Sequence, residues 1–302
     1  MTADLAAWVR EDFGVELASL DRARLGADTL AELWHGVSVA GQRFAVKLSA
    51  GGSAAGLTVP ALLAARGIDG VLAPLSTRDG RMWTIRGERR LSVAPWVSDR
   101  RGMDEGLTPA HWRHLGALLA EVHATEVTGE LAALPRESYD HGRLADTVHA
   151  LDFRRDDVDA VLAIADRLAN MLRDKENSVV VCHADPHTGN VLLDGEKVWL
   201  IDWDDAVLAP REQDLMFVLG GVLAFAPVTP GEQQAFFEGY GPVKVDQDHL
   251  RYHRCVRALV DLTEWALDGS EQALGHVRDV LSPTGLIAQS LHGHDLAAER
   301  HQ

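Results

Sequence analysis

The chain has 302 residues, of which 46% are hydrophobic and 25% are charged, as is ordinary for a globular protein with a sizeable core. Its 29 basic and 45 acidic residues give a net charge of −16, which disfavours nucleic acid and anionic membranes as partners and favours a cationic one. No apolar run approaches the ~20 residues that span a bilayer, and the N-terminus lacks the pattern of a signal peptide, so we expect a cytoplasmic protein with reduced cysteines.

Residues 1–97 are predicted to form a small lobe built on an antiparallel sheet. A helix with apolar residues at helical spacing covers residues 2–13, and a second helix covers 54–66. Alternating or β-branched runs bounded by turn residues predict the strands, which are 15–20, 31–39, 43–48, 71–75, 82–85 and 90–94.

Lys47 is the first lysine of the chain and lies in the predicted strand 43–48. In that strand Phe44, Val46 and Leu48 alternate with Ala45 and Lys47, so the lysine points away from the apolar face. Taken alone, this pattern favours a solvent-facing lysine.

Residues 98–302 are predicted to form a larger and mainly helical lobe. A polar, glycine-containing linker, 98–106, opens this lobe. Apolar residues at helical spacing then predict the helices, which are 110–124, 156–173, 215–222, 230–240, 246–267 and 271–281.

The most informative stretch of the chain is 179–205. Two apolar runs bracket the polar loop 183–190, and an Asp-Gly turn at 194–195 joins two short strands into a hairpin. This arrangement predicts that Asp185, Asn190 and Asp202 gather at strand ends. A carboxylate that accepts a proton from a hydroxyl, together with oxygen ligands for magnesium, is what phosphoryl transfer needs.

The loop allows two other interpretations. In the first, Asp185 and Asn190 are turn residues and His183 is a buried structural histidine, which is the ordinary reading of each residue taken singly. In the second, His183, Asp185 and His187 bind a hydrolytic metal ion. His183 and His187 are four residues apart and would face the same way only on a helix, whereas Pro186 favours a loop.

The loop reads H-x-D-x-x-x-x-N and is followed by Ile201-Asp202-Trp203-Asp204. This combination resembles the aminoglycoside phosphotransferase family of small-molecule kinases, and the segments 208–218 and 236–241 are similar to its spectinomycin phosphotransferase branch. The resemblance implies an α+β, bilobal, protein-kinase-like fold. It also implies ATP or GTP with Mg²⁺ as cofactors and a hydroxyl of a cationic antibiotic as acceptor.

The same resemblance assigns roles to single residues. It makes Asp185 the catalytic base, Asn190 and Asp202 the metal ligands, and Lys47 a phosphate contact. Nucleotide contacts are also expected in a phosphate loop at 26–29 and in the inter-lobe hinge 92–97, where Pro95 has no N–H to donate. The residues expected there are Asp28, Ser92, Ala94 and Val97.

One departure from the kinase pattern concerns the partner of Lys47. In protein kinases a glutamate on the following helix pairs with this lysine. No acidic residue occurs between Lys47 and Asp69, so Asp202 is a candidate to replace that glutamate.

Acceptor binding is expected from carboxylates and indole rings, namely Trp203, Asp204, Asp205, Glu212, Glu238 and Trp265. A kinase for choline, a sugar or an amino-acid-like alcohol, or a catalytically silent nucleotide- or antibiotic-binding protein, are the alternatives. A monomer or homodimer is expected.

Overall fold

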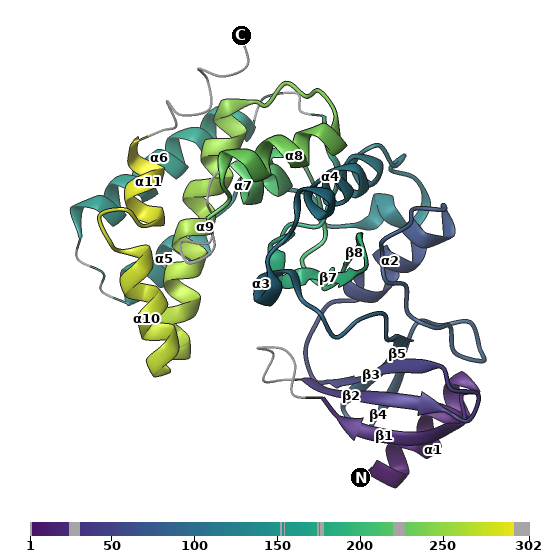
Figure 1. Ribbon diagram of the computed structural model, residues 1–302. Coiled ribbons are helices and arrows are strands. Elements are labelled where there is room, and N and C mark those ends of the chain that lie inside the picture. The colour runs from purple at the N-terminus through teal and green to yellow at the C-terminus, as the bar shows by residue number, and fades with distance from the viewer. Residues whose placement is uncertain are drawn as a thin grey trace. The chain divides into compact units, whose positions relative to one another are not determined.

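The computed structural model describes residues 2–23, 31–151, 153, 155–173, 175, 178–219 and 227–292 (Figure 1). The chain divides into two compact units, and each unit is discontinuous in sequence. The first contains residues 1–107, 128–131 and 188–206, and the second contains 108–127, 132–187 and 207–302. The chain therefore passes from one unit to the other inside the loop 183–190.

The first unit is built on a five-stranded antiparallel sheet of order β1-β2-β3-β5-β4. Its strands are β1 (Leu17–Arg22), β2 (Ala31–Ser38), β3 (Arg43–Ser49), β4 (Thr84–Arg86) and β5 (Arg89–Pro95). Helix α1 (Thr2–Phe13) packs on one face, where Leu5, Val9 and Phe13 share a core with β3. In β3, Phe44, Val46 and Leu48 are buried. The alternation predicted for this strand is therefore confirmed.

The rest of the first unit comes from two separate parts of the sequence. Helix α2 (Ala55–Ala65) follows β3, and the short helix α3 (Gly102–Glu105) lies within the predicted linker. The chain returns through the 3₁₀ turn η2 (Thr188–Asn190) and the hairpin of β7 (Val191–Asp194) and β8 (Lys197–Leu200). Gly195 has a φ of 61° in the hairpin turn, a conformation that glycine adopts without strain.

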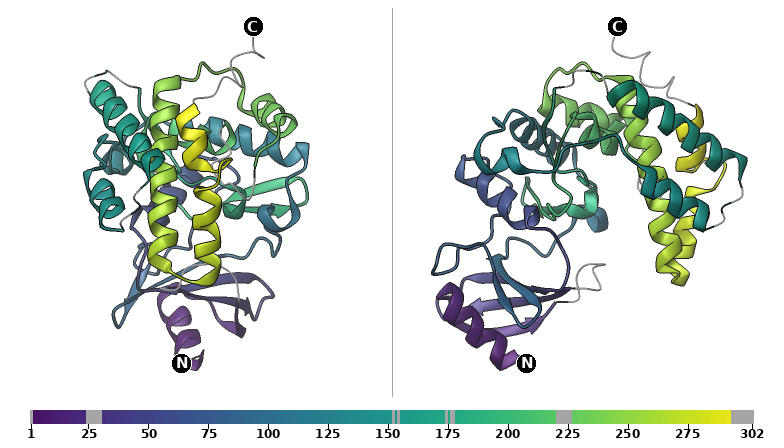
Figure 2. Two further views of the ribbon diagram at one scale, coloured as in Figure 1. Left: turned by 90° about the vertical axis from the view of Figure 1, so that its left-hand side faces the viewer. Right: turned by 180° about the vertical axis from the view of Figure 1, so that it is seen from behind.

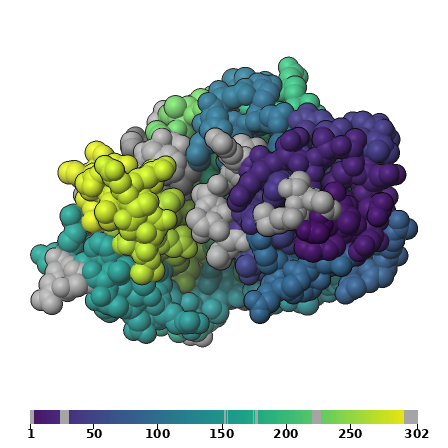
Figure 3. Space-filling model, turned by 90° about the horizontal axis from the view of Figure 1, so that it is seen from below, coloured from purple at the N-terminus to yellow at the C-terminus, as the bar shows by residue number. Residues whose placement is uncertain are grey.

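The second unit is mainly helical. Its helices are α4 (Pro109–His123), α5 (Gly142–Ala150), α6 (Asp156–Arg173), α7 (Glu212–Leu219), α8 (Pro230–Tyr240), α9 (Gln247–Asp268), α10 (Glu271–Val280) and α11 (Leu286–His292). Helix α9 packs against α5, α6, α7, α10 and α11, and both views of Figure 2 show it alongside α10. Helix α10 contributes to the surface that is drawn in yellow in Figure 3. In this unit β6 (Val180–Cys182) pairs with β9 (Val207–Ala209).

Helices α4 and α8 approach each other closely through two glycines. A Cβ on Gly116 would lie 2.0 Å from the carbonyl oxygen of Phe236, and one on Gly239 would lie 1.9 Å from that of Arg113. Real side chains do not approach backbone so closely, so both positions require glycine. The close packing positions the end of α4, which carries His123.

Some predicted elements differ from the structure. The apolar run 71–75 is not a strand: Val71 makes one isolated bridge to Leu200, and the Leu75 amide donates to the carbonyl of Val93. Strand β1 begins two residues later than predicted, and α7 begins before the predicted residue 215. Among the described residues, no helix is both long and apolar enough to cross a membrane.

Candidate active site

The loop that carries Asp185 is held from beneath by a buried carboxylate of the second unit. Asp214, in the first turn of α7, is fully buried. Its carboxylate oxygens accept hydrogen bonds from the backbone N–H groups of His183 (2.9 Å) and Ala184 (2.7 Å). Ala184 has a φ of 71°, a conformation that is strained for a residue with a side chain. Asp214 therefore holds in place the strained backbone that immediately precedes Asp185.

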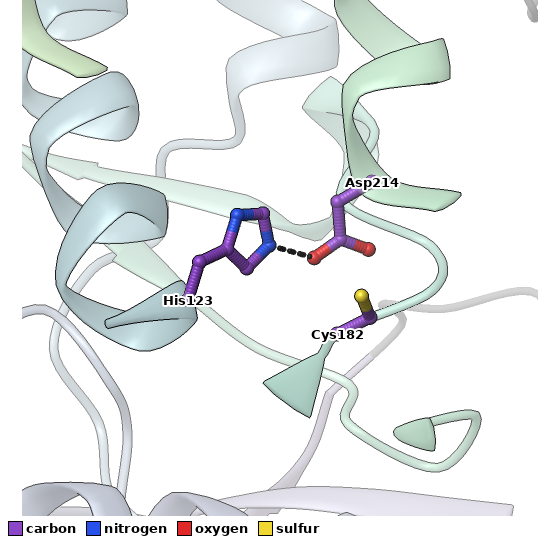
Figure 4. A group of neighbouring side chains, drawn as sticks. All are labelled: His123, Cys182 and Asp214. Atoms are coloured by element: carbon purple, nitrogen blue, oxygen red, sulfur yellow. Dashed lines mark hydrogen bonds and ion pairs between the residues drawn. The ribbon is translucent and has the colours of Figure 1, made fainter. Parts of the chain in front are cut away.

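Asp214 belongs to a buried polar group with His123 and Cys182 (Figure 4). His123 Nε2 lies 2.9 Å from Asp214 Oδ2, and His123 Nδ1 lies 2.7 Å from the Tyr240 hydroxyl. The Cys182 thiol lies 3.6 Å from the carbonyl oxygen of Ala209, and burial raises its pKa well above the usual value. A metal would need the thiolate. With both His123 nitrogens already engaged, this group forms a hydrogen-bond network under the loop.

Asp185 is partly buried, with 20% of its side chain exposed. Its Oδ1 accepts a hydrogen bond of 2.8 Å from Arg257 Nη1, and its Oδ2 lies 3.4 Å from His187 Nε2. Burial acts to raise the pKa of Asp185, but the hydrogen bond from His187 and the charges of Arg257, His187 and His183 outweigh it, so the pKa is lowered. Asp185 is therefore a carboxylate at neutral pH, the form that accepts a hydrogen bond from a hydroxyl.

The other predicted site residues of this region belong to the first unit. Asn190 ends η2, is 6% exposed, and its carbonyl accepts from the Ile201 amide at 3.0 Å. Arg101 Nη2 donates to the carbonyl of Gly189 at 2.8 Å. Asp202 follows β8 with a φ of 66°, so it too has a strained backbone. The hairpin thus joins Asn190, which offers an amide oxygen, to Asp202, which offers a carboxylate. Both groups are hard oxygen ligands that suit Mg²⁺.

Lys47 and the hinge lie on neighbouring strands of the same sheet. Lys47 pairs in register with Ser92, on the face of the sheet opposite to the α1 core. The Trp96 amide donates to Arg43 and the Val93 carbonyl accepts from Leu75.

Successive residues of a strand direct their backbone N–H and C=O groups to opposite sides, so those of Ser92 and Ala94 point towards β3. Outward-facing backbone groups are then expected at Pro95 (carbonyl) and Val97 (amide). Ala94 and Val97 are the two candidates for the backbone amide that donates to the adenine edge in place of Pro95. The geometry favours Val97.

Asp204, expected at the acceptor, is engaged within the first unit. Its Oδ1 accepts from the Ser53 amide at 2.6 Å, and its backbone carbonyl accepts from the Ser53 hydroxyl at 2.6 Å. Arg90 donates to the carbonyls of Gly51 and Gly52 in the same loop. Asp204 therefore connects the Asp202 segment to the loop before α2, and its acceptor role stays a prediction.

Other acceptor candidates have structural roles as well. Trp203 is 1% exposed and its indole donates to the Leu200 carbonyl at 3.1 Å, so no ring face is open for stacking. Glu212 is 5% exposed and accepts from the Asp246 amide at the start of α9. Glu238 pairs with an arginine of α4, and Trp265 packs in the helical core with a ring-centroid distance of 4.8 Å to His276.

Two further predicted residues have no established role in the structure. Asp205 is exposed, and its acceptor role stays a prediction. Asp28 and the proposed phosphate loop lie outside the described residues. The sequence analysis missed Arg257, although its i, i+4 spacing to Asp261 on a predicted helix was a signal of an ion pair.

Comparison with known families decides what kind of protein this is. Residues 43–258, well over half of the chain, match the phosphotransferase enzyme family. The chain belongs to this family. The α+β, kinase-like, bilobal fold predicted from the sequence is confirmed.

Solved structures of family members share this fold. Spectinomycin phosphotransferase, APH(9)-Ia, in complex with ADP and spectinomycin has a TM-score of 0.82 at 24% identity, covering 97% of this chain and 98% of that chain. Amicoumacin kinase hAmiN in complex with AMP-PNP and Ca²⁺ has 0.64 at 16%, covering 87% of each chain. The ternary complex of a thermostable APH(4)-Ia mutant with ADP and hygromycin B has 0.68 at 16%, covering 96% and 98%. No curated protein matches the sequence significantly.

Proposed function

We propose that this phosphotransferase moves the γ-phosphoryl group of ATP to a hydroxyl of a small molecule, with magnesium as cofactor. The observation that carries the proposal is the loop 183–190. Its Asp185 is ionised and fixed by Arg257 and, through the preceding backbone, by Asp214. The chain reaches Asn190 five residues later and Asp202 after one hairpin. Carboxylate, amide and carboxylate in this order match the requirements of phosphoryl transfer.

Asp185 receives the proton in this reaction. As the acceptor oxygen forms its bond to the γ-phosphorus, the bond from that phosphorus to the bridging oxygen of ADP breaks, and the hydroxyl proton passes to Asp185. Oδ1 is held by Arg257 at 2.8 Å, whereas Oδ2 has the longer contact, 3.4 Å to His187. These two contacts fix the orientation of the Asp185 carboxylate.

Asn190 and Asp202 would hold the metal, and their oxygen atoms are the donor type that Mg²⁺ prefers. When bound, magnesium neutralises charge on the nucleotide phosphates. Lys47 contributes a further positive charge on the sheet face opposite to α1. We assign nucleotide binding to residues 1–97, with the adenine edge read by the Pro95 carbonyl and the Val97 amide, and acceptor binding to residues 98–302.

For the acceptor we propose an aminocyclitol or aminoglycoside antibiotic, with a spectinomycin-like molecule as the leading candidate. Two observations support this choice. The net charge of −16 attracts a cationic ligand, and the fold is shared with a spectinomycin phosphotransferase over 97% of the chain.

The test is a magnesium-dependent ATP-consumption screen of the purified protein against spectinomycin, several aminoglycosides, choline and simple sugars, with mass detection of the product. An added phosphate on spectinomycin supports the whole proposal. Phosphate on another alcohol retains the reaction and replaces the acceptor. Nucleotide binding without any product would favour a catalytically silent binding protein. Asp185→Ala serves as the control for contaminating kinases.

A further inference from the structure

The catalytic carboxylate has a partly buried cationic neighbour that comes from a distant part of the sequence. Arg257, in the middle of α9, has 19% of its side chain exposed. Its Nη1 donates to Asp185 Oδ1 at 2.8 Å, and its Nε lies 2.7 Å from Asp261 Oδ1, one helical turn further along α9. The guanidinium carbon lies 5.2 Å from the ring centroid of Phe217 in α7.

These contacts fix the guanidinium from three directions. Asp261 faces one of its edges, Asp185 faces another, and the aromatic ring covers a face. A planar, rigid guanidinium retains such an arrangement, whereas a single ammonium group cannot reproduce it. Asp261 is 4% exposed, so it is a built-in counterion for Arg257 and not a solvated surface carboxylate.

We propose that Arg257 is a positioning residue for phosphoryl transfer, which holds the Asp185 carboxylate by Oδ1 and so orients it, with Asp261 as the anchor of Arg257. The inference deepens the proposed function and rests on it for the identity of the reaction. It adds a second support for Asp185, independent of the backbone support that Asp214 gives. Arg257 touches neither the acceptor nor the phosphate in this assignment.

The charges around this pair are consistent with the role. Asp185 faces Arg257 from α9 and both His183 and His187 from its own loop. Arg257 faces Asp185, Asp261 and Glu264. Burial acts to lower the pKa of Arg257, but the neighbouring carboxylates outweigh it and raise the pKa, so the side chain stays charged. Burial raises the pKa of Asp261 to about 6, and the charge of Arg257 opposes this rise.

The test compares Arg257→Gln and Arg257→Lys with a matched control, Arg251→Gln. Arg251 lies on the same helix and donates to the Leu291 carbonyl, away from Asp185. Removing the positive charge should raise the pKa of Asp185, because the charge of Arg257 is one of the causes that lower this pKa against burial. The acidic limb of kcat/KM should move to higher pH by the same amount.

We expect Arg257→Gln to lower kcat by about tenfold or more, with little change in KM for ATP. Arg257→Lys should keep the acidic limb near that of the wild type but recover kcat only in part. Lysine restores the positive charge but not the planar set of N–H donors of the guanidinium. The control variant should match the wild type. If Arg257→Gln fails to fold, the Lys variant decides: wild-type kcat in that variant contradicts the positioning role.

A second measurement separates this inference from the proposed reaction. Carboxyl NMR reports the titration of Asp185 in the wild type and in the Arg257 variants without any substrate. A raised Asp185 pKa in Arg257→Gln, in a protein that phosphorylates nothing, would retain the pairing and reject the reaction. Phosphotransferase activity with an unmoved Asp185 titration and an unmoved acidic limb would overturn the role of Arg257.

Discussion

The two units support their functional residues by different physical means. In the second unit, charged side chains hold Asp185: Arg257 contacts its carboxylate, and the buried Asp214 binds the preceding backbone. In the first unit, Asn190 and Asp202 are placed by backbone pairing in and beside the β7–β8 hairpin. Buried ion pairs hold one geometry and leave a costly unpaired charge when one partner is removed, whereas a backbone ladder tolerates most side-chain changes.

The difference matches the proposed division of labour. A proton acceptor needs a defined charge and orientation, which neighbouring charges provide. Metal ligands need correctly placed oxygen atoms, and the metal supplies the charge. Substitutions around Asp185 should therefore affect the chemical step, and those around the hairpin should affect nucleotide binding.

The largest effect is expected for Asp185→Ala. Loss of the proton acceptor should lower kcat by roughly 10²–10⁴-fold, while ATP affinity stays close to that of the wild type. Product formation measured by mass spectrometry, with ATP binding measured by calorimetry, checks both parts. Turnover within a few-fold of the wild type would exclude Asp185 as the base.

Gly116→Ala tests the packing that positions the end of α4. The new Cβ would lie 2.0 Å from the Phe236 carbonyl oxygen, and overpacking of this kind costs about 1–3 kcal/mol of unfolding free energy. Gly231→Ala is the matched control, because a Cβ there meets nothing within 4 Å. Denaturant unfolding should separate the two variants. Equal stability would show that α4 and α8 move apart without cost.

Asp214→Asn should cost about 1–3 kcal/mol, because one carboxylate oxygen that accepts a hydrogen bond becomes an amide group that donates. Because the affected backbone is that of His183 and Ala184, kcat should fall more than the affinity for ATP. Thermal unfolding and steady-state kinetics measure the two effects. A stable variant with normal kcat would mean that the loop holds its strained conformation without Asp214.

The smallest effect is expected in the first unit, for Ser53→Ala. The variant loses the hydroxyl bond to the Asp204 carbonyl but retains the backbone bond to the Asp204 carboxylate. The cost should be about 1 kcal/mol, with any kinetic change appearing in KM for ATP. A large loss of kcat would contradict the claim that substitutions in the first unit affect nucleotide binding and not the chemical step.

Local patterns made much of this structure predictable. The Asp-Gly turn and short β-branched runs were enough for the β7–β8 hairpin, and helical periodicity gave α6 and α8 with the observed bounds. The apolar run 71–75 was wrong as a strand, because apolar residues also occur in irregular segments packed on a sheet. The loop motif brought out Asp185, Asn190 and Asp202 because their spacing is local.

Long-range contacts could not be predicted in this way. Arg257 lies 72 residues from Asp185, and Ser53 lies 151 residues from Asp204. No periodicity links such pairs. For the same reason Trp203 and Glu212 looked available to an acceptor, although both are buried in the folded chain.

The most direct test of the account is a magnesium titration of ATP binding in the wild type, Asp185→Ala and Asp202→Ala. We expect magnesium to strengthen binding in the wild type and in Asp185→Ala to a similar degree, and we expect Asp202→Ala to lose this dependence. Retention of magnesium-dependent binding in Asp202→Ala, or its loss in Asp185→Ala, would contradict the separation of the proton acceptor from the metal ligands.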